Sequence, residues 1–127
     1  DKFTVEIISP DQSILKSEAS EVTIPSYEGQ MGILKDHIPL ITFVRPGLIL
    51  IKNQEENKFY VEEGTVEFSN NNLLILTSTA KDLKNFDKSL INNLLEQAKQ
   101  KLQDKNSTDK EKYIISYQID TLKEINR

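Results

Sequence analysis

The chain has 127 residues, of which 37% are hydrophobic and 28% are charged, and its formal net charge at pH 7 is −4. This length suits one domain, or a small domain with an appendage, and the acidic balance argues against a general nucleic-acid binder. The absence of cysteine excludes a disulfide framework and thiolate chemistry, and no apolar run approaches the ~18 residues that a membrane-spanning helix needs.

The first 80 residues carry the pattern of short β-strands. Phe3, Val5 and Ile7 alternate with polar residues, which is the period of a half-buried strand. Further apolar or alternating runs follow between turn signals rich in Pro, Gly and Asn, at residues 21–24, 40–44, 48–51, 59–61, 66–68 and 73–76. This spacing predicts an all-β sandwich or barrel of short antiparallel strands, and no helix-period segment interrupts it to build a parallel α/β sheet.

The hydrophobic period changes near Lys81. Asp87 is placed to cap a helix with one apolar stripe, formed by Leu90, Ile91, Leu94, Leu95, Ala98 and Leu102. After a break at residues 105–107, Thr108 and Glu111 match a capping box at the start of a second helix. Its apolar face comprises Ile115, Ile119, Leu122 and Ile125, widened by Tyr113, Ile114 and Tyr117. The whole chain is therefore predicted to be an α+β protein, a sandwich followed by an antiparallel two-helix hairpin.

Charge separates the same two parts of the chain. Residues 1–82 carry 7 basic and 13 acidic side chains, whereas residues 83–127 carry 9 basic and 7 acidic ones. The sequence therefore predicts a sandwich domain over residues 1–82 and a helical hairpin domain over residues 83–127, with different electrostatic partners.

The segment EGQMGILKDHIPLI, residues 28–41, holds the single histidine and methionine of the chain. A phosphate-binding loop is disfavoured there, because Gly29 and Gly32 are three residues apart and no Lys-Ser/Thr pair follows. Glycines at such positions more commonly permit a tight turn or bulge.

Catalysis by this chain is also disfavoured. His37 is the sole candidate base, and Asp36 beside it is poorly placed to orient its ring if both lie on a strand. One histidine without cysteine makes a zinc site improbable, and the acidic pairs at 55–56 and 62–63 have the character of solvated turn residues. We expect no enzyme activity, no metal site and no cofactor.

Taken with its neighbours, the segment resembles the epsilon-subunit family of bacterial F-type ATP synthases, whose mitochondrial counterpart is the delta subunit. That family shows a strand, a Glu-Gly-x-x-Gly turn, an apolar pair, His-x-Pro-Leu and then Pro-Gly, which are matched in order by residues 22–47. Residues 59–67 resemble its strand with a glycine turn and Val-Glu, and residues 73–80 resemble its final strand, which ends in Thr-Ala. The match runs in order from residue 3 to residue 80.

The resemblance implies a non-catalytic rotor subunit of the central stalk in the F1 sector, contributing to ATP synthesis and proton transport. Its sandwich would dock on the gamma subunit and touch the c-ring, with Gly29 and Gly32 shaping the turn and Pro39 and Pro46 stiffening it. The residues that would form this interface are Ser9, Glu28, Gly29, Gln30, Met31, Gly32, His37 and Pro39. Many relatives carry an acidic residue at the position of Gln30, so the resemblance does not extend to charge pairing there.

The resemblance also gives the hairpin a regulatory role. Family hairpins fold against the sandwich or extend toward the alpha and beta catalytic subunits and block ATP hydrolysis, with basic residues meeting an acidic segment of beta. The corresponding candidates are Lys110, Lys112, Lys123 and Arg127. Some relatives bind ATP through Ile-Asp-x-x-Arg-Ala, but residues 86–91 read FDKSLI, which keeps the Asp and lacks the Arg-Ala, so we expect no tight ATP binding.

Two further expectations complete the sequence-based account. The resemblance implies a peripheral location on the cytoplasmic face of the bacterial inner membrane, reached through the complex, and the isolated chain is expected to be a monomer with an exposed apolar patch. The alternative is a free-standing β-sandwich protein-binding module with a helical tail. A carbohydrate-binding version is weak, because the chain has no Trp and its Tyr residues are scattered.

Overall fold

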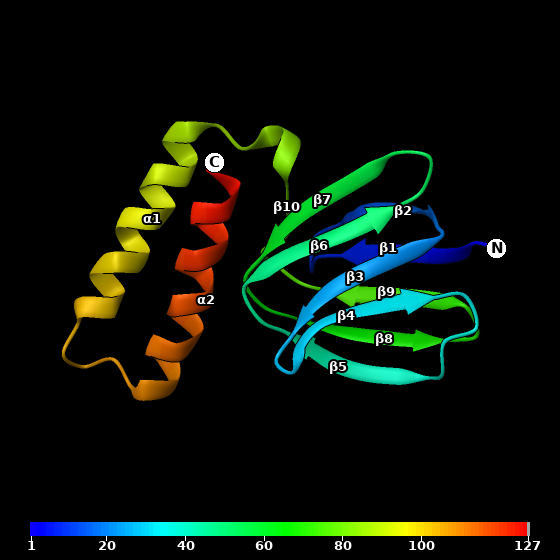
Figure 1. The fold of residues 1–127 in the computed structure, drawn as a ribbon, viewed down its shortest axis with the longest axis horizontal. Coiled ribbons are helices and arrows are strands. Elements are labelled where there is room, and N and C mark those ends of the chain that lie inside the picture. The colour runs from blue at the N-terminus through cyan, green and yellow to red at the C-terminus, as the bar shows by residue number, and fades with distance from the viewer. Residues whose placement is uncertain (127) are drawn as a thin grey trace.

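The computed structural model describes residues 1–126 and shows a two-layered β-sandwich with a helical hairpin at one end (Figure 1). The strands are β1 (Phe3–Ile8), β2 (Ser13–Ala19), β3 (Glu21–Ser26), β4 (Gly29–Leu34), β5 (Leu40–Val44), β6 (Gly47–Lys52), β7 (Glu56–Val61), β8 (Gly64–Ser69), β9 (Asn72–Leu76) and β10 (Lys81–Asp82). A short 3-10 helix, η1 (Leu83–Asn85), leads to α1 (Lys88–Gln103) and α2 (Asp109–Ile125).

The strands form two layers that share one corner. One layer contains β10, β7, β6, β3 and β4, and the other contains β5, β8, β9, β1 and β2. The layers are joined where Ser26 of β3 pairs with Val44 of β5. Neighbouring strands are antiparallel except β1 and β9, which are parallel and lie far apart in the sequence. The α+β fold predicted from the sequence is confirmed.

Three strands were not predicted from the sequence. β10 is two residues long, and β2 (SILKSEA) lies at the edge of its layer with two half-buried neighbours, Ile14 and Leu15, in place of a clean alternation. β4 (GQMGIL) contains two glycines, which weaken a strand signal because glycine has low strand propensity.

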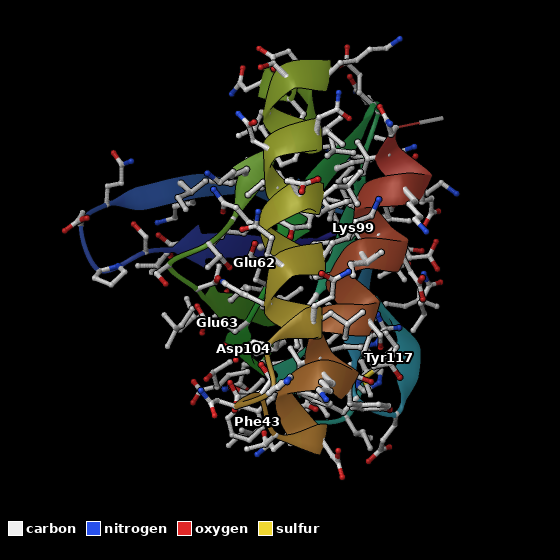
Figure 2. The ribbon with its side chains drawn as sticks, turned by 90° about the vertical axis from the view of Figure 1, so that its left-hand side faces the viewer. Phe43, Glu62, Glu63, Lys99, Asp104 and Tyr117 are labelled. Carbon is white, nitrogen blue, oxygen red and sulfur yellow. The ribbon has the colours of Figure 1, made fainter. Side chains whose placement is uncertain are left out.

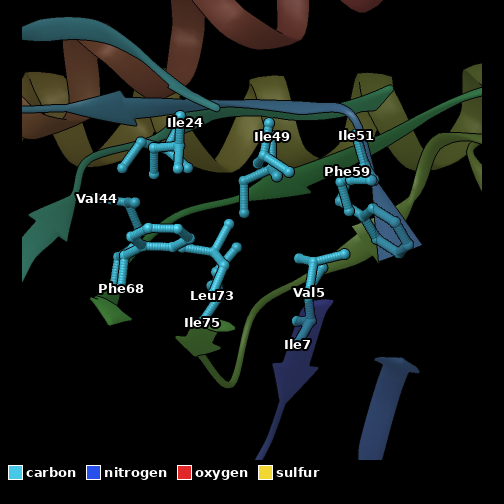
Figure 3. Packing of buried hydrophobic residues seen from close by; sticks show 14 of the residues in the cluster. Val5, Ile7, Ile24, Val44, Ile49, Ile51, Phe59, Phe68, Leu73 and Ile75 are labelled. Atoms are coloured by element: carbon cyan, nitrogen blue, oxygen red, sulfur yellow. The ribbon is translucent and has the colours of Figure 1, made fainter. Parts of the chain in front are cut away.

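The sandwich core lies between the two layers (Figure 3). Ile24, Ile49 and Ile51 from one layer meet Phe68 and Ile75 from the other, and all are at most 1% exposed. The ring of Phe3 stands edge-on to that of Phe68, with their centroids 5.6 Å apart, a favourable aromatic arrangement. The alternation of buried and half-buried residues in β1 and β6 explains why each layer has one dry face.

The helices begin where the sequence predicts. The Asp87 carboxylate accepts a hydrogen bond from the Leu90 backbone N–H, and Thr108 and Glu111 form the full capping box at the start of α2. α2 lies between α1 and the sandwich in Figure 1. A second apolar cluster joins both helices to the sandwich through Tyr60 of β7, and it contains Tyr60, Ile91, Leu95, Ala98, Ile115, Ile119 and Leu122.

Candidate interaction surfaces

The hairpin packs against one end of the sandwich, which we call the helix end. This end holds the turns at residues 9–12, 27–28, 62–63 and 77–79, together with the segment 45–48. The opposite end, which we call the far end, holds the turns at residues 35–39, 53–55 and 70–71. The two ends of a six-residue strand lie about 16–20 Å apart.

Tyr60 is the main side chain that the sandwich contributes to the hairpin contact. It is fully buried, and its ring lies 5.4 Å from that of Phe86, which precedes α1. The Tyr60 hydroxyl donates a 2.8 Å hydrogen bond to Glu62 Oε2, and Gln118 Nε2 of α2 donates to the same oxygen over 2.9 Å. Burial raises the pKa of the Tyr60 hydroxyl well above its usual range, and the negative charge of Glu62 raises it further.

A second contact joins Arg45 to α2. The Arg45 guanidinium carbon lies 4.0 Å from the ring centroid of Tyr117, within the range of a cation–π interaction. The same guanidinium donates a 2.9 Å hydrogen bond to the Pro46 carbonyl oxygen, which fixes its orientation. The Tyr117 hydroxyl in turn pairs with that of Tyr113 at 2.7 Å. The hairpin is therefore closed on the sandwich.

One group of the predicted interface residues lies at the helix end, in and beside the β1–β2 and β3–β4 turns. Ser9 closes the β1–β2 turn by donating to the Gln12 carbonyl oxygen over 3.2 Å. Glu28 and Gln30 are exposed, and Gly29 adopts a φ of 117°, which only glycine tolerates well. Gln30 lines a cavity of about 330 Å³ between β3, β6 and α2, beside Arg45.

The sequence analysis expected Gly32 to shape a turn, and the structure shows that it does not. The tight turn is formed by Tyr27 and Glu28, and Gly32 lies in the middle of β4, paired with Thr23 of β3. A Cβ atom built on Gly32 would meet only the Glu21 carboxylate at 3.6 Å, an ordinary contact. Met31, its neighbour, is half-buried against the sandwich core.

The second group of predicted residues, His37 and Pro39, lies at the far end. His37 Nδ1 lies 2.7 Å from the Ile38 carbonyl oxygen, and its ring stands edge-on to Phe68. The Asp36 carboxylate is bound instead by the Asn71 side-chain amide at 3.0 Å, so it does not orient the His37 ring. Because His37 lies in a turn, the argument from strand alternation did not apply, although its conclusion about Asp36 stands.

An exposed apolar strip lies on β5 and on the loop that precedes it. Ile38, Ile41 and Phe43 are 74%, 72% and 60% exposed, and we call them the β5 strip. The strip starts at the far end and reaches the helix end, where Figure 2 shows Phe43. Phe43 and Tyr27 line a cavity of about 520 Å³ there. Sequence reasoning predicted residues 40–44 as a strand but did not single out these residues as exposed. A strand in a two-layered sandwich keeps one face outside, but a run that is apolar on both faces does not show which one.

The basic residues predicted on the hairpin occupy different settings. Lys110 lines the 520 Å³ cavity together with Phe43 and Glu63. Lys112 is half-buried and Lys123 is exposed on α2. Arg127 lies outside the described residues.

The described residues show no arrangement that points to catalysis. Within residues 1–126 no group of three His, Asp or Glu side chains could hold a metal ion, and no helix is long and apolar enough to cross a membrane. Asp87 is the residue that this chain keeps from the ATP-binding motif of some relatives. Its carboxylate caps α1 by accepting a 2.8 Å hydrogen bond from the Leu90 backbone N–H.

Comparison with known proteins gives a family and close relatives. The family model described as the beta-sandwich domain of the ATP synthase delta/epsilon chain matches residues 2–82. An ATP synthase epsilon chain of Pelagibacter ubique is 45% identical over 128 residues, covering 99% of this chain and 98% of the relative. The mitochondrial ATP synthase subunit delta of Schizosaccharomyces pombe is 35% identical and aligns with 86% of this chain and 66% of its own length.

Solved structures show the same fold. A chain in the Euglena gracilis mitochondrial ATP synthase has a TM-score of 0.81 at 20% identity, covering 99% of this chain and 82% of that one. A chain from the central stalk and c-ring of the Tetrahymena thermophila enzyme has a TM-score of 0.68 at 16% identity, covering 98% of this chain and 96% of that one.

Proposed function

Since the chain belongs to the delta/epsilon family of ATP synthase subunits and is a non-catalytic part of the central stalk, we propose that residues 1–82 dock it on the gamma subunit and the c-ring. Residues 83–127 form the regulatory unit in this proposal. Family membership replaces the free-standing binding module that the sequence analysis kept as its alternative. Through the complex, the subunit lies peripherally on the cytoplasmic face of the bacterial inner membrane.

The observation that carries this proposal is the β5 strip. Ile38, Ile41 and Phe43 are large apolar side chains held outside a well-packed core. Isolated apolar residues are common on surfaces, but a group of large exposed apolar side chains on one strand and the loop before it is typical of an interaction site. The strip runs from the far end, where His37 lies, to the helix end, where Phe43 and Tyr27 line one cavity. A partner that lies along β5 reaches both ends of the sandwich.

The test is complex formation with the cognate gamma subunit, measured as complex mass by multi-angle scattering on a sizing column. The wild-type chain is expected to give a stable one-to-one complex. Phe43→Glu places a charge at the helix end of the strip and is expected to weaken the affinity roughly 30-fold, the scale of an interface hot spot. His37→Glu tests the far end and is expected to weaken it less.

Leu102→Glu is the matched control. It introduces the same charge at an apolar residue that is 37% exposed but lies on α1, away from the strip. Gamma binding is expected to stay within twofold of the wild-type value. Failure of the wild-type chain to bind folded gamma, or equal weakening by Leu102→Glu and Phe43→Glu, would contradict the proposal.

Membership of the delta/epsilon family also supports a regulatory role for the hairpin. When the hairpin opens, the basic residues of α2 become free to meet an acidic segment of the beta subunit and inhibit ATP hydrolysis. The supporting observation is that Lys110 of α2 lines a cavity together with Phe43 and Glu63 of the sandwich while the hairpin is closed. ATP hydrolysis by the reconstituted F1 sector is expected to be faster when Lys110, Lys112 and Lys123 are all replaced by Ala. An unchanged rate would contradict this role.

A further inference from the structure

The loop between β4 and β5, residues 35–39, is tied to the β8–β9 turn at the far end of the sandwich (Figure 1). The Asp36 backbone N–H donates a 2.7 Å hydrogen bond to Asn71 Oδ1, and Asn71 Nδ2 donates a 3.0 Å hydrogen bond back to Asp36 Oδ1. The loop carries the chain from one layer of the sandwich to the other, whereas the β8–β9 turn belongs to the second layer. The Asn71 side chain therefore holds the crossing loop to the layer that the chain enters at β5.

Asn71 is the fixed member of this pair. Asn70 and Asn71 are the two residues between β8 and β9, and their φ angles of 50° and 58° give the left-handed turn that suits a two-residue hairpin. The Asn71 carbonyl oxygen also accepts a 3.0 Å hydrogen bond from the Thr4 N–H of β1. Because its backbone is held in this way, the Asn71 side chain has a set position from which to bond Asp36.

Asp36 is the member that needs a partner. Its φ of 67° lies in the left-handed region, which costs free energy for any residue with a Cβ atom, although Asp and Asn tolerate it best. The two hydrogen bonds with Asn71 offset this cost. The next residue, His37, donates its backbone N–H to the Leu34 carbonyl oxygen over 3.1 Å and sets its ring edge-on to Phe68. The loop is thus held at successive residues.

The loop held in this way presents Ile38. The Ile38 side chain is 74% exposed, so its position contributes little burial to the isolated chain. Ordering a loop costs conformational entropy, and a partner binds more tightly when the loop is already ordered before binding. Ile38 is also the far-end member of the β5 strip, which the proposed function assigns to the gamma subunit. An ordered loop that exposes an apolar side chain is the form expected of a preorganised interface.

We propose that Asn71 is a positioning residue for docking, because its side chain holds residues 35–39 in the conformation that presents Ile38 to the gamma subunit. The identity of the partner rests on the proposed function. Asn71 itself lies outside the β5 strip and outside the interface residues predicted from the sequence. The hold on the loop is a property of the isolated chain, whereas the gain in affinity is a property of the complex, so the two are measured separately.

The first experiment measures, by NMR hydrogen exchange, the protection of the backbone amide at position 36 in the isolated full-length chain. Asn71→Asp keeps an acceptor oxygen but replaces the amide donor with a second carboxylate, which repels that of Asp36. Protection is expected to fall about fivefold to tenfold, the scale of one lost hydrogen bond. The exchanged pair, Asp36→Asn with Asn71→Asp, again has one amide and one carboxylate. It is expected to return protection to within about twofold of the wild-type value.

Asn70→Asp is the matched control. It makes the same chemical change at the neighbouring turn residue, which also has a positive φ and takes part in the turn through its carbonyl oxygen, a 3.1 Å acceptor for Asn72 Nδ2. Protection at position 36 is expected to stay within about twofold of the wild-type value in this variant. Amides of β8 and β9 should be unchanged in all variants. Unchanged protection in Asn71→Asp, or an equal loss in Asn70→Asp, would overturn the hold on the loop.

The second experiment measures the affinity of the same variants for the cognate gamma subunit by titration calorimetry. Asn71→Asp is expected to weaken binding roughly fivefold to tenfold, by the loss of the preorganised loop. Asn70→Asp, which adds the same charge to the same turn, and the exchanged pair are expected to stay within about twofold of the wild-type affinity. In an Ile38→Ala background, Asn71→Asp is expected to weaken binding by less than about twofold, because the loop then has no large side chain to position.

Two results would overturn the positioning role of Asn71. One is wild-type affinity in Asn71→Asp. The other is an equal loss of affinity in the wild-type and Ile38→Ala backgrounds, which would indicate a general effect on the fold. If the wild-type chain does not bind folded gamma, the proposed function itself fails, and the inference about Asn71 fails with it. That outcome is seen in the wild-type chain alone, so the two failures are distinguishable.

Discussion

The sandwich and the hairpin bury apolar surface in different ways. The sandwich core is built entirely from its own strands, and most of its residues are fully buried. The hairpin cluster needs Tyr60 from the sandwich at its centre, and four of its residues, Ile91, Leu95, Ile115 and Ile119, remain 4% to 9% exposed. The comparison teaches that the sandwich has a core of its own, whereas the hairpin completes its apolar cluster with a residue of the sandwich. A separable hairpin is what a regulatory element requires.

The largest expected effect comes from breaking the sandwich core. Phe68→Ala removes a side chain that is 1% exposed and packs against Phe3. We expect the free energy of unfolding to fall by ~3–5 kcal/mol, the usual cost of deleting a buried aromatic ring. Urea unfolding followed by circular dichroism should show sheet and helix lost together. A variant that lost the sheet but kept the helices would contradict the view that the hairpin depends on the sandwich.

Breaking the hairpin cluster should have a smaller and local effect. Leu122→Ala removes the one fully buried leucine of that cluster, and we expect it to weaken hairpin packing by ~2–4 kcal/mol. The sandwich should keep its native methyl NMR shifts while helical circular dichroism falls. Leu102→Ala, at a leucine that is 37% exposed, is the control and should cost well under half as much. Collapse of the sandwich spectrum in Leu122→Ala would show that the two units are not separable.

Alkaline pH should weaken the contact between the hairpin and the sandwich, because it ionises Tyr60. Its pKa is raised in the folded chain above its usual value of 10.0, because burial and the Glu62 carboxylate disfavour the phenolate. The folded state therefore holds this proton more tightly than the unfolded state. The contribution of Tyr60 to the free energy of unfolding is therefore fully present below pH 10. It declines by about 1.4 kcal/mol per pH unit as the pH rises above 10.

The measurement is helical circular dichroism between pH 8 and pH 11.5. The wild-type hairpin should be lost more steeply with pH than that of Tyr60→Phe, which keeps the ring and has no proton to lose. Equal pH dependence in the two proteins would show that Tyr60 ionisation does not limit the hairpin contact.

The smallest expected effect concerns the start of α2. Thr108→Ala removes the hydroxyl that accepts the Glu111 backbone N–H at 3.1 Å, and helix caps of this kind contribute ~1 kcal/mol. Amide exchange in the first turn of α2 should rise about fivefold, while the sandwich amides stay unchanged. Thr108→Ser preserves the cap and should behave as the wild type. Equal exchange rates in the Thr108→Ala and Thr108→Ser variants would show that the Thr108 hydroxyl does not stabilise the start of α2.

Much of the local structure was predictable from the sequence. The caps at Asp87 and Thr108 are short-range signals, because a side chain bonds backbone groups two or three residues away, and both are confirmed. β2 and β4 were missed because edge position and glycine weaken the alternating pattern. The β5 strip was missed for a related reason, since an apolar strand does not show in sequence which of its faces lies outside.

The candidate interaction surfaces were also predictable only in part. The order of motifs was enough to predict the fold and the family, both of which are confirmed. The roles of Ser9, Gln30, His37 and the hairpin lysines in binding stay predictions. The sequence did not reveal that Ser9 and His37 lie at opposite ends of the sandwich, because that depends on the direction of each strand in the folded sheets.

By itself the sequence determined the order of sandwich and helical hairpin, most of the strands and the start of each helix, because hydrophobic period and capping depend on neighbours along the chain. Only the tertiary structure decided which carboxylate meets α2, which tyrosine is buried beneath it and which strand shows an apolar face. Glu62 and Gln118 are 56 residues apart in the chain and share one hydrogen bond. Such contacts arise from the packing of whole layers, and no local pattern encodes them.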